Sequence, residues 1–291
     1  MTATVATVET RGGRTLTYGT YGPPDGAPVF WLHGTPASRL SVHPDAGFYD
    51  RHGVRAITYD RPGYGGSTPD PSRDVAAAAA DISDLADALG IERFGVLGTS
   101  GGGPHALACG AMVAPRVTRV AVFVGAAPPD DPDFDMLAGM SPSNVEEFEA
   151  AKRGREALAE VLERYVTAMA ADPLAALDTI AHELPEPDQA MLRRPDVREM
   201  LRASSAEAVR QGGAGWIDDD LAFVRPWGFA LADVQPEVRL WQGSLDVLVP
   251  RAHGEYLAER LPRASFTLVD GAGHLLVEEW ALGVEWLVDA A

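Results

Sequence analysis

The sequence predicts an α/β protein whose central, mostly parallel sheet is covered by helices on both faces. Three observations favour this class. Short apolar runs of strand length alternate with longer segments of helical periodicity, which is typical of strand–helix–strand units. Hydrophobic residues make up 46% of the 291 residues, enough for a large core. A glycine-rich pentapeptide directly follows one apolar run and precedes a helical segment.

Eight segments are expected to form strands. The first two are Thr4–Val8 and Thr15–Tyr21, which alternate in polarity on either side of a Gly12-Gly13 turn. The other six are the apolar runs Pro28–Leu32, Val54–Tyr59, Arg93–Leu97, Val117–Val124, Val238–Trp241 and Ser265–Val269. Helices are expected between them at Asp74–Leu89, Pro104–Val113, Arg251–Leu261 and Leu276–Val288.

The alternation of strands and helices stops between about Pro128 and Asp233. This stretch has no clear strand and much helical periodicity. Pro128-Pro129 opens it, and Gly212-Gly213 lies near its end. We therefore expect a helical insertion over 129–233, and a core formed by 1–128 and 234–291.

The bulk composition restricts the partners and the compartment. The formal net charge is -18, so the chain should repel nucleic acid and anionic membranes. Cys109 is the only cysteine, which excludes an intramolecular disulfide. We find no signal peptide in Met1–Pro24 and no apolar run long enough to span a membrane, so a cytoplasmic protein is expected. The sequence does not determine the oligomeric state, and a homodimer is one of the alternatives that stay open.

The pentapeptide Gly98-Thr99-Ser100-Gly101-Gly102 matches the G-x-S-x-G pattern of a nucleophile elbow. In such an elbow the serine has strained backbone geometry at a sharp turn between a strand and a helix. Residues two positions away on either side must be small, or they would clash with the adjacent strand or helix. The following helix points its first N–H groups at the serine oxygen and favours negative charge there. We therefore expect Ser100 to be a nucleophile.

A serine nucleophile needs a general base, and the base needs a carboxylate that orients it. Two late loops supply these groups, with Asp246 after the Val238–Trp241 strand and His274 after the Ser265–Val269 strand. The resulting chain order of Ser, Asp and His is the one that the elbow motif predicts. His274 is the only histidine downstream of Asp246 in a glycine loop after a strand. Rival positions for the acid stay open at Asp130, Asp131 and Asp270.

Acyl transfer builds negative charge on the carbonyl oxygen, so fixed N–H donors must already point there. One donor is expected to be the backbone N–H of Gly101, directly after the nucleophile. The second should come from the segment His33-Gly34-Thr35-Pro36, which follows the third strand. Proline has no N–H, so Thr35 is the expected donor in this loop.

Several motifs together resemble the α/β-hydrolase superfamily over nearly the whole chain. They are Leu32-His33-Gly34-Thr35-Pro36, Asp60–Ser67, Gly98–Gly103, Leu245-Asp246 with Pro250, and Gly273-His274. The resemblance implies an eight-stranded sheet with a helical lid after the sixth strand. It also implies that Arg61 and Gly63 hold loops near the active site and take no part in chemistry. Relatives that are epoxide hydrolases or dehalogenases carry aspartate at the elbow, so Ser100 disfavours both.

Aromatic and methionine side chains in the insertion predict a mostly apolar substrate pocket. The residues expected to line it are His33, Phe134, Met136, Leu137, Met140, Trp216, Trp227, Leu245 and Val247. Acidic residues early in the insertion, including Glu146 and Glu147, are expected to form a solvated face, with a cationic substrate as the alternative. Neither a Cys/His zinc pattern nor a dinucleotide fingerprint occurs, so we expect no metal and no cofactor.

These features predict a serine hydrolase that cleaves carboxylic esters of small, mainly apolar molecules through an acyl-enzyme. The same triad serves other bonds, since fold and triad do not fix the substrate. Prolyl aminopeptidase, carbon–carbon hydrolase, acyltransferase, and cofactor-free haloperoxidase or perhydrolase activities stay open. The loop His33-Gly34-Thr35-Pro36-Ala37 departs from the H-G-G-P-G of prolyl aminopeptidases. A non-catalytic ligand-binding protein is the alternative outside enzymes, and the complete triad disfavours it.

Overall fold

A computed structural model describes residues 4–290 and contains one eight-stranded sheet. The strand order is β1-β2-β4-β3-β5-β6-β7-β8. β1 and β2 run antiparallel to their neighbours, whereas β4, β3, β5, β6, β7 and β8 are mutually parallel. The prediction of a mostly parallel eight-stranded sheet is confirmed. The strands are β1 Thr4–Glu9, β2 Thr15–Tyr21, β3 Ala27–Leu32, β4 Val54–Tyr59, β5 Phe94–Thr99, β6 Val117–Phe123, β7 Glu237–Gly243 and β8 Ala264–Val269.

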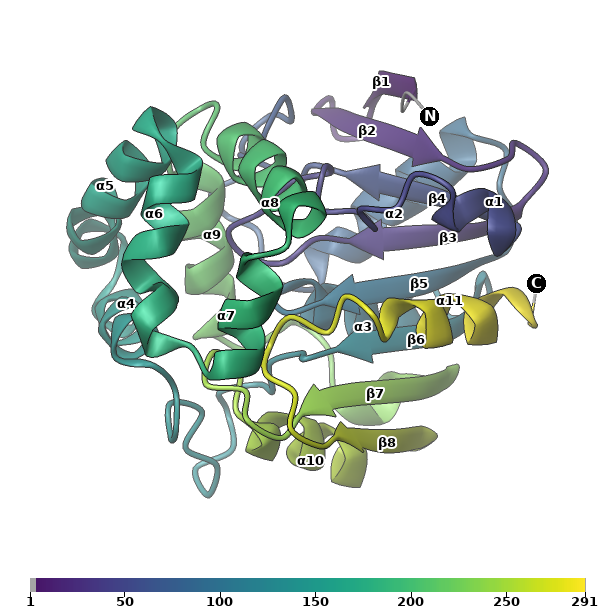
Figure 1. Ribbon diagram of the computed structural model, residues 1–291. Coiled ribbons are helices and arrows are strands. Elements are labelled where there is room, and N and C mark those ends of the chain that lie inside the picture. The colour runs from purple at the N-terminus through teal and green to yellow at the C-terminus, as the bar shows by residue number, and fades with distance from the viewer. Residues whose placement is uncertain (1–3, 291) are drawn as a thin grey trace.

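Helices cover both faces of the sheet, as Figure 1 shows. They are α1 Phe48–Arg51, α2 Ala77–Ala88, α3 Gly102–Met112, α10 Arg251–Arg260 and α11 Trp280–Val288. α2, α3 and α10 pack on one face, and α1 and α11 pack on the other. Within β3, Phe30 and Leu32 point to the first face, while Val29 and Trp31 point to the second. Burial on both faces explains why the parallel strands are continuous apolar runs.

Two helices begin later than the sequence suggests. Before α2 the chain forms a tight turn, in which the N–H groups of Ala78 and Ala79 donate to the carbonyls of Val75 and Ala76, three residues back. Before α11 the N–H of Leu275 donates to the carboxylate of Asp188, and the chain runs as a loop and turns until Trp280.

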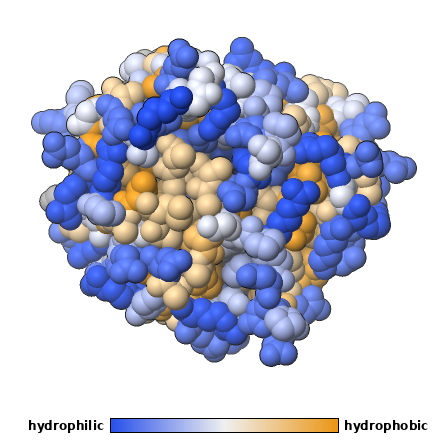
Figure 2. Space-filling model, turned by 180° about the vertical axis from the view of Figure 1, so that it is seen from behind, coloured by the Kyte–Doolittle hydropathy of each residue, from blue (hydrophilic) through white to orange (hydrophobic). Residues whose placement is uncertain are grey.

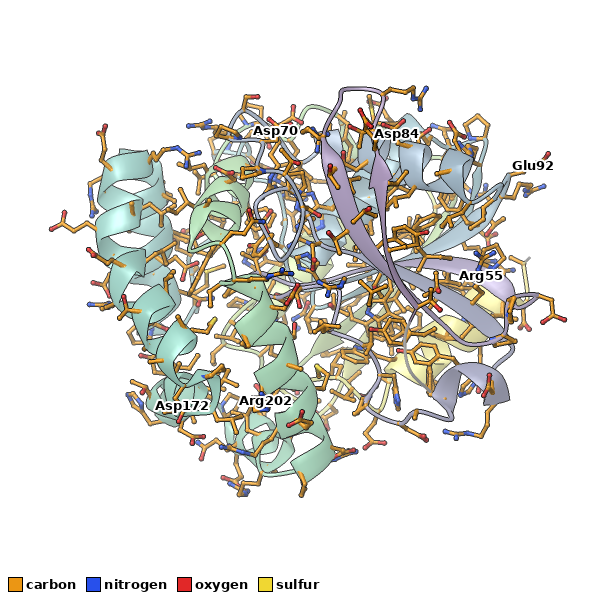
Figure 3. All side chains as sticks on the ribbon, turned by 90° about the horizontal axis from the view of Figure 1, so that it is seen from above. Arg55, Asp70, Asp84, Glu92, Asp172 and Arg202 are labelled. Carbon is orange, nitrogen blue, oxygen red and sulfur yellow. The ribbon has the colours of Figure 1, made fainter. Side chains whose placement is uncertain are left out.

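Between β6 and β7 the chain forms helices only, within the described residues. They are α4 Pro142–Arg153, α5 Arg155–Ala171, α6 Pro173–Ile180, α7 Glu186–Leu192, α8 Pro195–Ala208 and α9 Ala214–Phe223, with short 3₁₀ turns at Ala181–Glu183 and Leu231–Asp233. We call this segment the helical insertion. Figures 1 and 3 show it standing beside the sheet, beyond the carboxyl ends of the parallel strands. The boundaries at 129 and 233 stay predictions.

Some charged side chains lie at the periphery, whereas others, such as Asp219, are buried. Asp172 and Arg202 on the insertion and Glu92 on the opposite side lie at the outside in Figure 3. The face in Figure 2 is hydrophilic at most of its margin, with a mildly hydrophobic area near its centre. None of the described helices is long and apolar enough to cross a membrane.

Candidate active site

Polar side chains gather where the parallel strands end. Ser100 follows β5, Asp246 follows β7 and His274 follows β8. The loop of Thr35 follows β3. The carboxyl ends of parallel strands meet at one edge of a sheet, which is where open α/β sheets bind their ligands. The topology thus brings segments far apart in the sequence to one edge.

Ser100 occupies a strained turn between β5 and α3. Its φ is +53°, a left-handed conformation that non-glycine residues seldom adopt. Its N–H donates to the carbonyl of Phe123 (2.8 Å), and its carbonyl accepts the N–H of Gly103 (2.8 Å). A Cβ on Gly98 would collide with the carbonyl oxygen of Gly102, so this position has no space for a side chain. The glycine pattern therefore follows from close backbone approach, as predicted.

Asp246 and His274 form a buried hydrogen-bonded pair. Nδ1 of His274 lies 2.8 Å from Oδ2 of Asp246, and the two residues are 9% and 5% exposed. The other carboxylate oxygen, Oδ1, accepts the backbone N–H groups of Leu248 and Val249 at 2.9 Å each. Nε2 of Gln242 donates to Oδ2 at 3.0 Å. Because a carboxylate only accepts, Nδ1 of His274 carries its proton and Nε2 can serve as the base.

The environment of His274 favours its charged form. Burial opposes the charge, but the negative charge and hydrogen bond of Asp246 outweigh burial and raise the pKa of His274. The charge of Asp188 contributes in the same direction. An imidazole that gains a proton in the course of a reaction is therefore stabilised here.

The loops of Asp246 and His274 are tied to each other. A Cβ on Gly243 would collide with the carbonyl oxygen of Gly273, and the N–H of Leu245 donates to Ala272 (2.8 Å). Of the rival acids, Asp130 is exposed on the surface, and the other two are engaged elsewhere. The Asp270 carboxylate accepts the hydroxyl of Ser244 (3.5 Å), and Asp131 pairs with Arg260 (2.8 Å). Asp246 is the acid that contacts the His274 ring.

An aspartate of the insertion also holds the histidine loop, although no sequence pattern pointed to it. Asp188 of α7 is 1% exposed. Its two oxygens accept the backbone N–H groups of His274 (2.9 Å) and Leu275 (2.8 Å). Gly273 has no room for a Cβ because the Asp188 carboxylate lies against it. The insertion thus fixes the backbone from which the candidate base projects.

Thr35 and Gly101 lie against each other beside the serine. A Cβ on Gly101 would approach the Thr35 hydroxyl to 2.5 Å, and one on Gly34 would lie 3.2 Å from the Ser100 Cβ. Within residues 4–290, neither the N–H of Thr35 nor the N–H of Gly101 donates to a backbone carbonyl in a loop or turn. Two N–H groups beside the serine oxygen can bind the oxygen of a reacting carbonyl.

A second insertion aspartate, Asp219 of α9, holds the Thr35 loop. It accepts the Thr35 hydroxyl (2.6 Å), the Tyr64 hydroxyl (2.8 Å) and the guanidinium of Arg61 (2.6 Å). It also pairs with Arg73 at 2.5 Å. Burial opposes the charge of Asp219, but the two arginines outweigh burial and hold its pKa well below the usual value.

Arg61 links this network to the sheet edge. Its guanidinium donates to the carbonyl oxygens of His33 and Gly34 (2.9 Å for Gly34). The expectation that Arg61 holds the loops near the site is therefore confirmed. The other expected loop residue, Gly63, packs against Gly215 at the start of α9, where a Cβ would come within 2.8 Å of backbone.

A cavity of about 270 Å³ lies between the strand ends and the insertion. Thr35, Ser100, Gly101 and His274 all line it. Among the described residues, the side chains of Ser100 and His274 line this cavity without a hydrogen bond between them. Hydrogen bonds between a nucleophile and its base often form only when substrate binds. The insertion provides a mainly apolar wall that includes Met140, Phe148, Tyr165, Met169, Trp216 and Phe223. Val124 also lines it with a positive φ of +49°, a second strained backbone at the cavity.

The cavity wall differs from the expected one at seven positions. Of the nine residues, the structure places Met140 and Trp216 in the wall. Trp227 lies in the main core, and Phe134 packs on His253 and Tyr256. Met136 and Leu137 are buried in a small cluster of the insertion.

The remaining three residues are also absent from the cavity wall. His33 is 1% exposed, and its Nε2 accepts the N–H of Arg61. Leu245 is 47% exposed on the surface. Val247 receives the N–H of Ser141 at its carbonyl (2.7 Å), while its neighbours Leu248 and Val249 line the cavity.

Comparisons with known proteins agree with this architecture. A model of the alpha/beta hydrolase family matches residues 29–285. The chain is 35% identical over 149 residues to a non-heme chloroperoxidase of Streptomyces lividans. The matched residues make up 50% of this chain and 54% of that protein. It is 29% identical over 123 residues to a bifunctional esterase/perhydrolase of Acinetobacter calcoaceticus, covering 42% and 45%. The chain thus spans about half the length of these curated relatives.

Solved structures show the likeness over the whole chain. An esterase from a Rhodococcus species has a TM-score of 0.69 at 19% identity and covers 98% of both chains. At this identity the likeness concerns the fold alone.

Proposed function

This chain belongs to the alpha/beta hydrolase family, and we propose that it hydrolyses carboxylic esters of small, mainly apolar molecules with Ser100 as its nucleophile. The observation that carries the proposal is the buried Asp246–His274 pair at 2.8 Å in the same cavity as the strained Ser100. A serine beside a histidine that is oriented by a carboxylate is the arrangement used for acyl transfer on several unrelated folds.

Acylation begins when the Ser100 oxygen attacks the ester carbonyl carbon and its proton passes to Nε2 of His274. The carbonyl π electrons move to the oxygen, where the N–H groups of Thr35 and Gly101 bind the negative charge. Asp246 stabilises the imidazolium that forms. Collapse of this intermediate breaks the bond to the alcohol oxygen, which takes the proton from His274 and leaves.

Deacylation repeats these steps with water in place of the serine. His274 takes a proton from water, and the water oxygen attacks the acyl carbon. The bond to the Ser100 oxygen then breaks, the serine regains its proton from His274, and the carboxylic acid leaves. We propose that the helical insertion acts as the lid, because its apolar side chains close the cavity on the side away from the sheet.

Replacement of the nucleophile tests this proposal. Ser100→Ala should abolish hydrolysis of a short p-nitrophenyl ester, whereas Ser143→Ala, which changes another serine of the same cavity, should retain turnover. Undiminished turnover by Ser100→Ala would exclude Ser100 as the nucleophile.

A second activity of the same site is favoured by the curated relatives, since one is a bifunctional esterase/perhydrolase and the other a non-heme chloroperoxidase. In perhydrolysis, hydrogen peroxide attacks the acyl-Ser100 carbon in place of water. His274 takes the proton of the attacking peroxide and returns it to the Ser100 oxygen as the bond to that oxygen breaks, and a peracid leaves. No cofactor is needed for this exchange of nucleophiles.

Perhydrolysis is tested by adding hydrogen peroxide to a reaction with a short ester and measuring the peracid. If the site has this activity, peracid should form with wild type and not with Ser100→Ala. Formation of the carboxylic acid alone would restrict the enzyme to hydrolysis.

A further inference from the structure

Helix α9 carries three consecutive buried aspartates, and only two of them have a cationic partner. Asp218, Asp219 and Asp220 are 3%, 0% and 0% exposed. Asp218 pairs with Arg155, and Asp219 pairs with Arg61 and Arg73. Among the described residues, Asp220 forms no salt bridge.

Neither oxygen of Asp220 receives a hydrogen bond from an N–H or hydroxyl donor of the described residues. Asp220 nevertheless lines the cavity that contains Ser100 and His274. A buried carboxylate is unfavourable unless it is paired and hydrogen-bonded. Because no N–H or hydroxyl group donates to it, this carboxyl in the cavity wall can accept hydrogen bonds from a ligand.

A second carboxyl stands beside it. Glu147 of α4 lines the same cavity, and its side chain is close enough to Asp220 for the two to share a proton. Nε1 of Trp216 donates to Oε1 of Glu147 at 2.7 Å. Burial, and then the neighbouring carboxyl, raises the pKa of Asp220, and burial raises that of Glu147. The N–H of Trp216 favours the charged form of Glu147.

This charge is not balanced by the cavity wall, which contains no arginine or lysine among the described residues. The guanidinium of Arg73 lowers the pKa of Asp220, but Arg73 is already paired with Asp219. Asp219 itself adds negative charge on the same helix. The rest of the insertion side is mainly apolar.

We propose that Glu147 and Asp220 form a subsite for the protonated amino group of the substrate, so that the preferred esters carry a primary ammonium. This inference rests on the proposed hydrolase function and specifies its substrate class. An ammonium has three N–H donors and no acceptor, which suits two adjacent carboxylates. The sequence predicts Glu147 on a solvated face, whereas the structure places it in the cavity wall.

Binding of an ammonium should displace the proton that the two carboxyls share. A lower pH keeps this proton in place, and its loss at higher pH opens the site to the cation. The KM for an ammonium ester should therefore fall as pH rises, relative to the KM for a neutral ester of the same shape. The neutral ester reports any titration of His274, so the ratio isolates the acidic pair.

The substrate test uses benzyl esters of linear ω-amino acids of increasing chain length, each paired with the ester in which a methyl group replaces the ammonium. For at least one length, kcat/KM should favour the ammonium ester by about tenfold or more, as expected for a desolvated charge pair. A neutral preference at every length would overturn the proposal.

Variants locate the preference. Asp220→Asn and Glu147→Gln should each bring the ratio of the paired substrates toward one, and Glu147→Gln keeps an acceptor for Trp216. Glu146→Gln is the matched control, because Glu146 is exposed and pairs with Arg164 on the surface. A preference retained in both cavity variants, or lost in the control, would also overturn the assignment.

A binding measurement separates failure of the subsite from failure of the nucleophile. Calorimetry on Ser100→Ala should detect binding of n-butylammonium and far weaker binding of n-pentanol. If no ester is turned over while this difference persists, the proposed function fails and the subsite stands. If esters are hydrolysed and the two probes bind alike, the subsite fails alone.

Discussion

The strand ends and the helical insertion face each other across one cavity, and their polar groups are paired to different degrees. At the strand ends, Asp246 accepts hydrogen bonds from His274, Gln242 and two backbone N–H groups. Across the cavity, Asp220 receives none from N–H or hydroxyl donors of the described residues. In the proposed mechanism the reacting groups are therefore held in place before substrate arrives, whereas the proposed subsite of the insertion is completed by the substrate.

The insertion also holds two of the loops at the strand ends. Asp188 fixes the backbone of His274, and Asp219 fixes the loop of Thr35. Both aspartates are buried, and both contact residues that are distant in the sequence. In the proposed mechanism the strand ends supply the reacting groups, and two insertion carboxylates hold the loops that present these groups.

The largest effect is expected from Asp246→Asn. An asparagine amide can offer Nδ1 of His274 a donor where the carboxylate offered an acceptor, which favours the wrong tautomer. The kcat should fall by about 10⁴-fold, the order seen for this change in another serine hydrolase. Asp270→Asn, a nearby exposed loop aspartate, should change kcat little. Equal losses in the two variants would contradict the assignment of Asp246.

The next effect concerns stability and is expected from Asp219→Asn. The change leaves Arg61 and Arg73 buried without their counter-charge, and breaking such a pair costs about 3–5 kcal/mol. Denaturant titration measures the loss. Asp218→Asn is the control, because its partner Arg155 is 43% exposed and can be solvated. A control that loses as much stability as Asp219→Asn would mean that the Asp219 network has no special part in joining the two regions.

Asp188→Asn should act on the histidine loop. An asparagine has one carbonyl oxygen for the two N–H groups of His274 and Leu275, so one buried donor loses its acceptor at a cost of about 1–3 kcal/mol. The kcat/KM should fall by about 10- to 100-fold because the base is displaced. Glu186→Gln, an exposed change on the same helix, is the control. Unchanged kcat/KM and stability in Asp188→Asn would show that the insertion does not hold the histidine loop in place.

The smallest effect is a shift in the pH profile. His274 must be neutral to take a proton, so activity is lost as pH falls through its pKa. Because Asp246 raises this pKa, the acid limb of kcat/KM should have its midpoint above the usual value of about 6.5. The limb should move to lower pH in Asp188→Asn, since Asp188 contributes to the raised pKa. A limb that lies below the usual value in wild type would contradict the paired geometry.

The same two regions differ in how far the sequence predicts them. The sheet follows from continuous apolar runs, and Ser100, Asp246 and His274 each lie in a loop shortly after a strand, with glycines beside Ser100 and His274. Such signals lie within a few neighbouring residues of the sequence, so they can be recognised without a structure. The contact of the Asp246 and His274 side chains then follows from strand order.

The insertion is less predictable because its contacts depend on how its helices pack. Met140 and Trp216 line the cavity, yet the similar residues Phe134 and Trp227 pack into cores. Composition does not distinguish these cases, since all four are large and apolar. Asp219 meets Arg61 across 158 positions, which no local pattern encodes. Three consecutive aspartates between apolar residues of a helix were the one available signal for the buried acids.

Labelling with a fluorophosphonate tests most directly whether the strand ends carry the nucleophile. We expect one phosphonate per chain, attached to the peptide that contains Ser100, with labelling absent in Ser100→Ala and slowed in Asp246→Asn. Attachment to another serine, or no labelling of the folded wild-type protein, would contradict the assignment of Ser100 as an activated nucleophile.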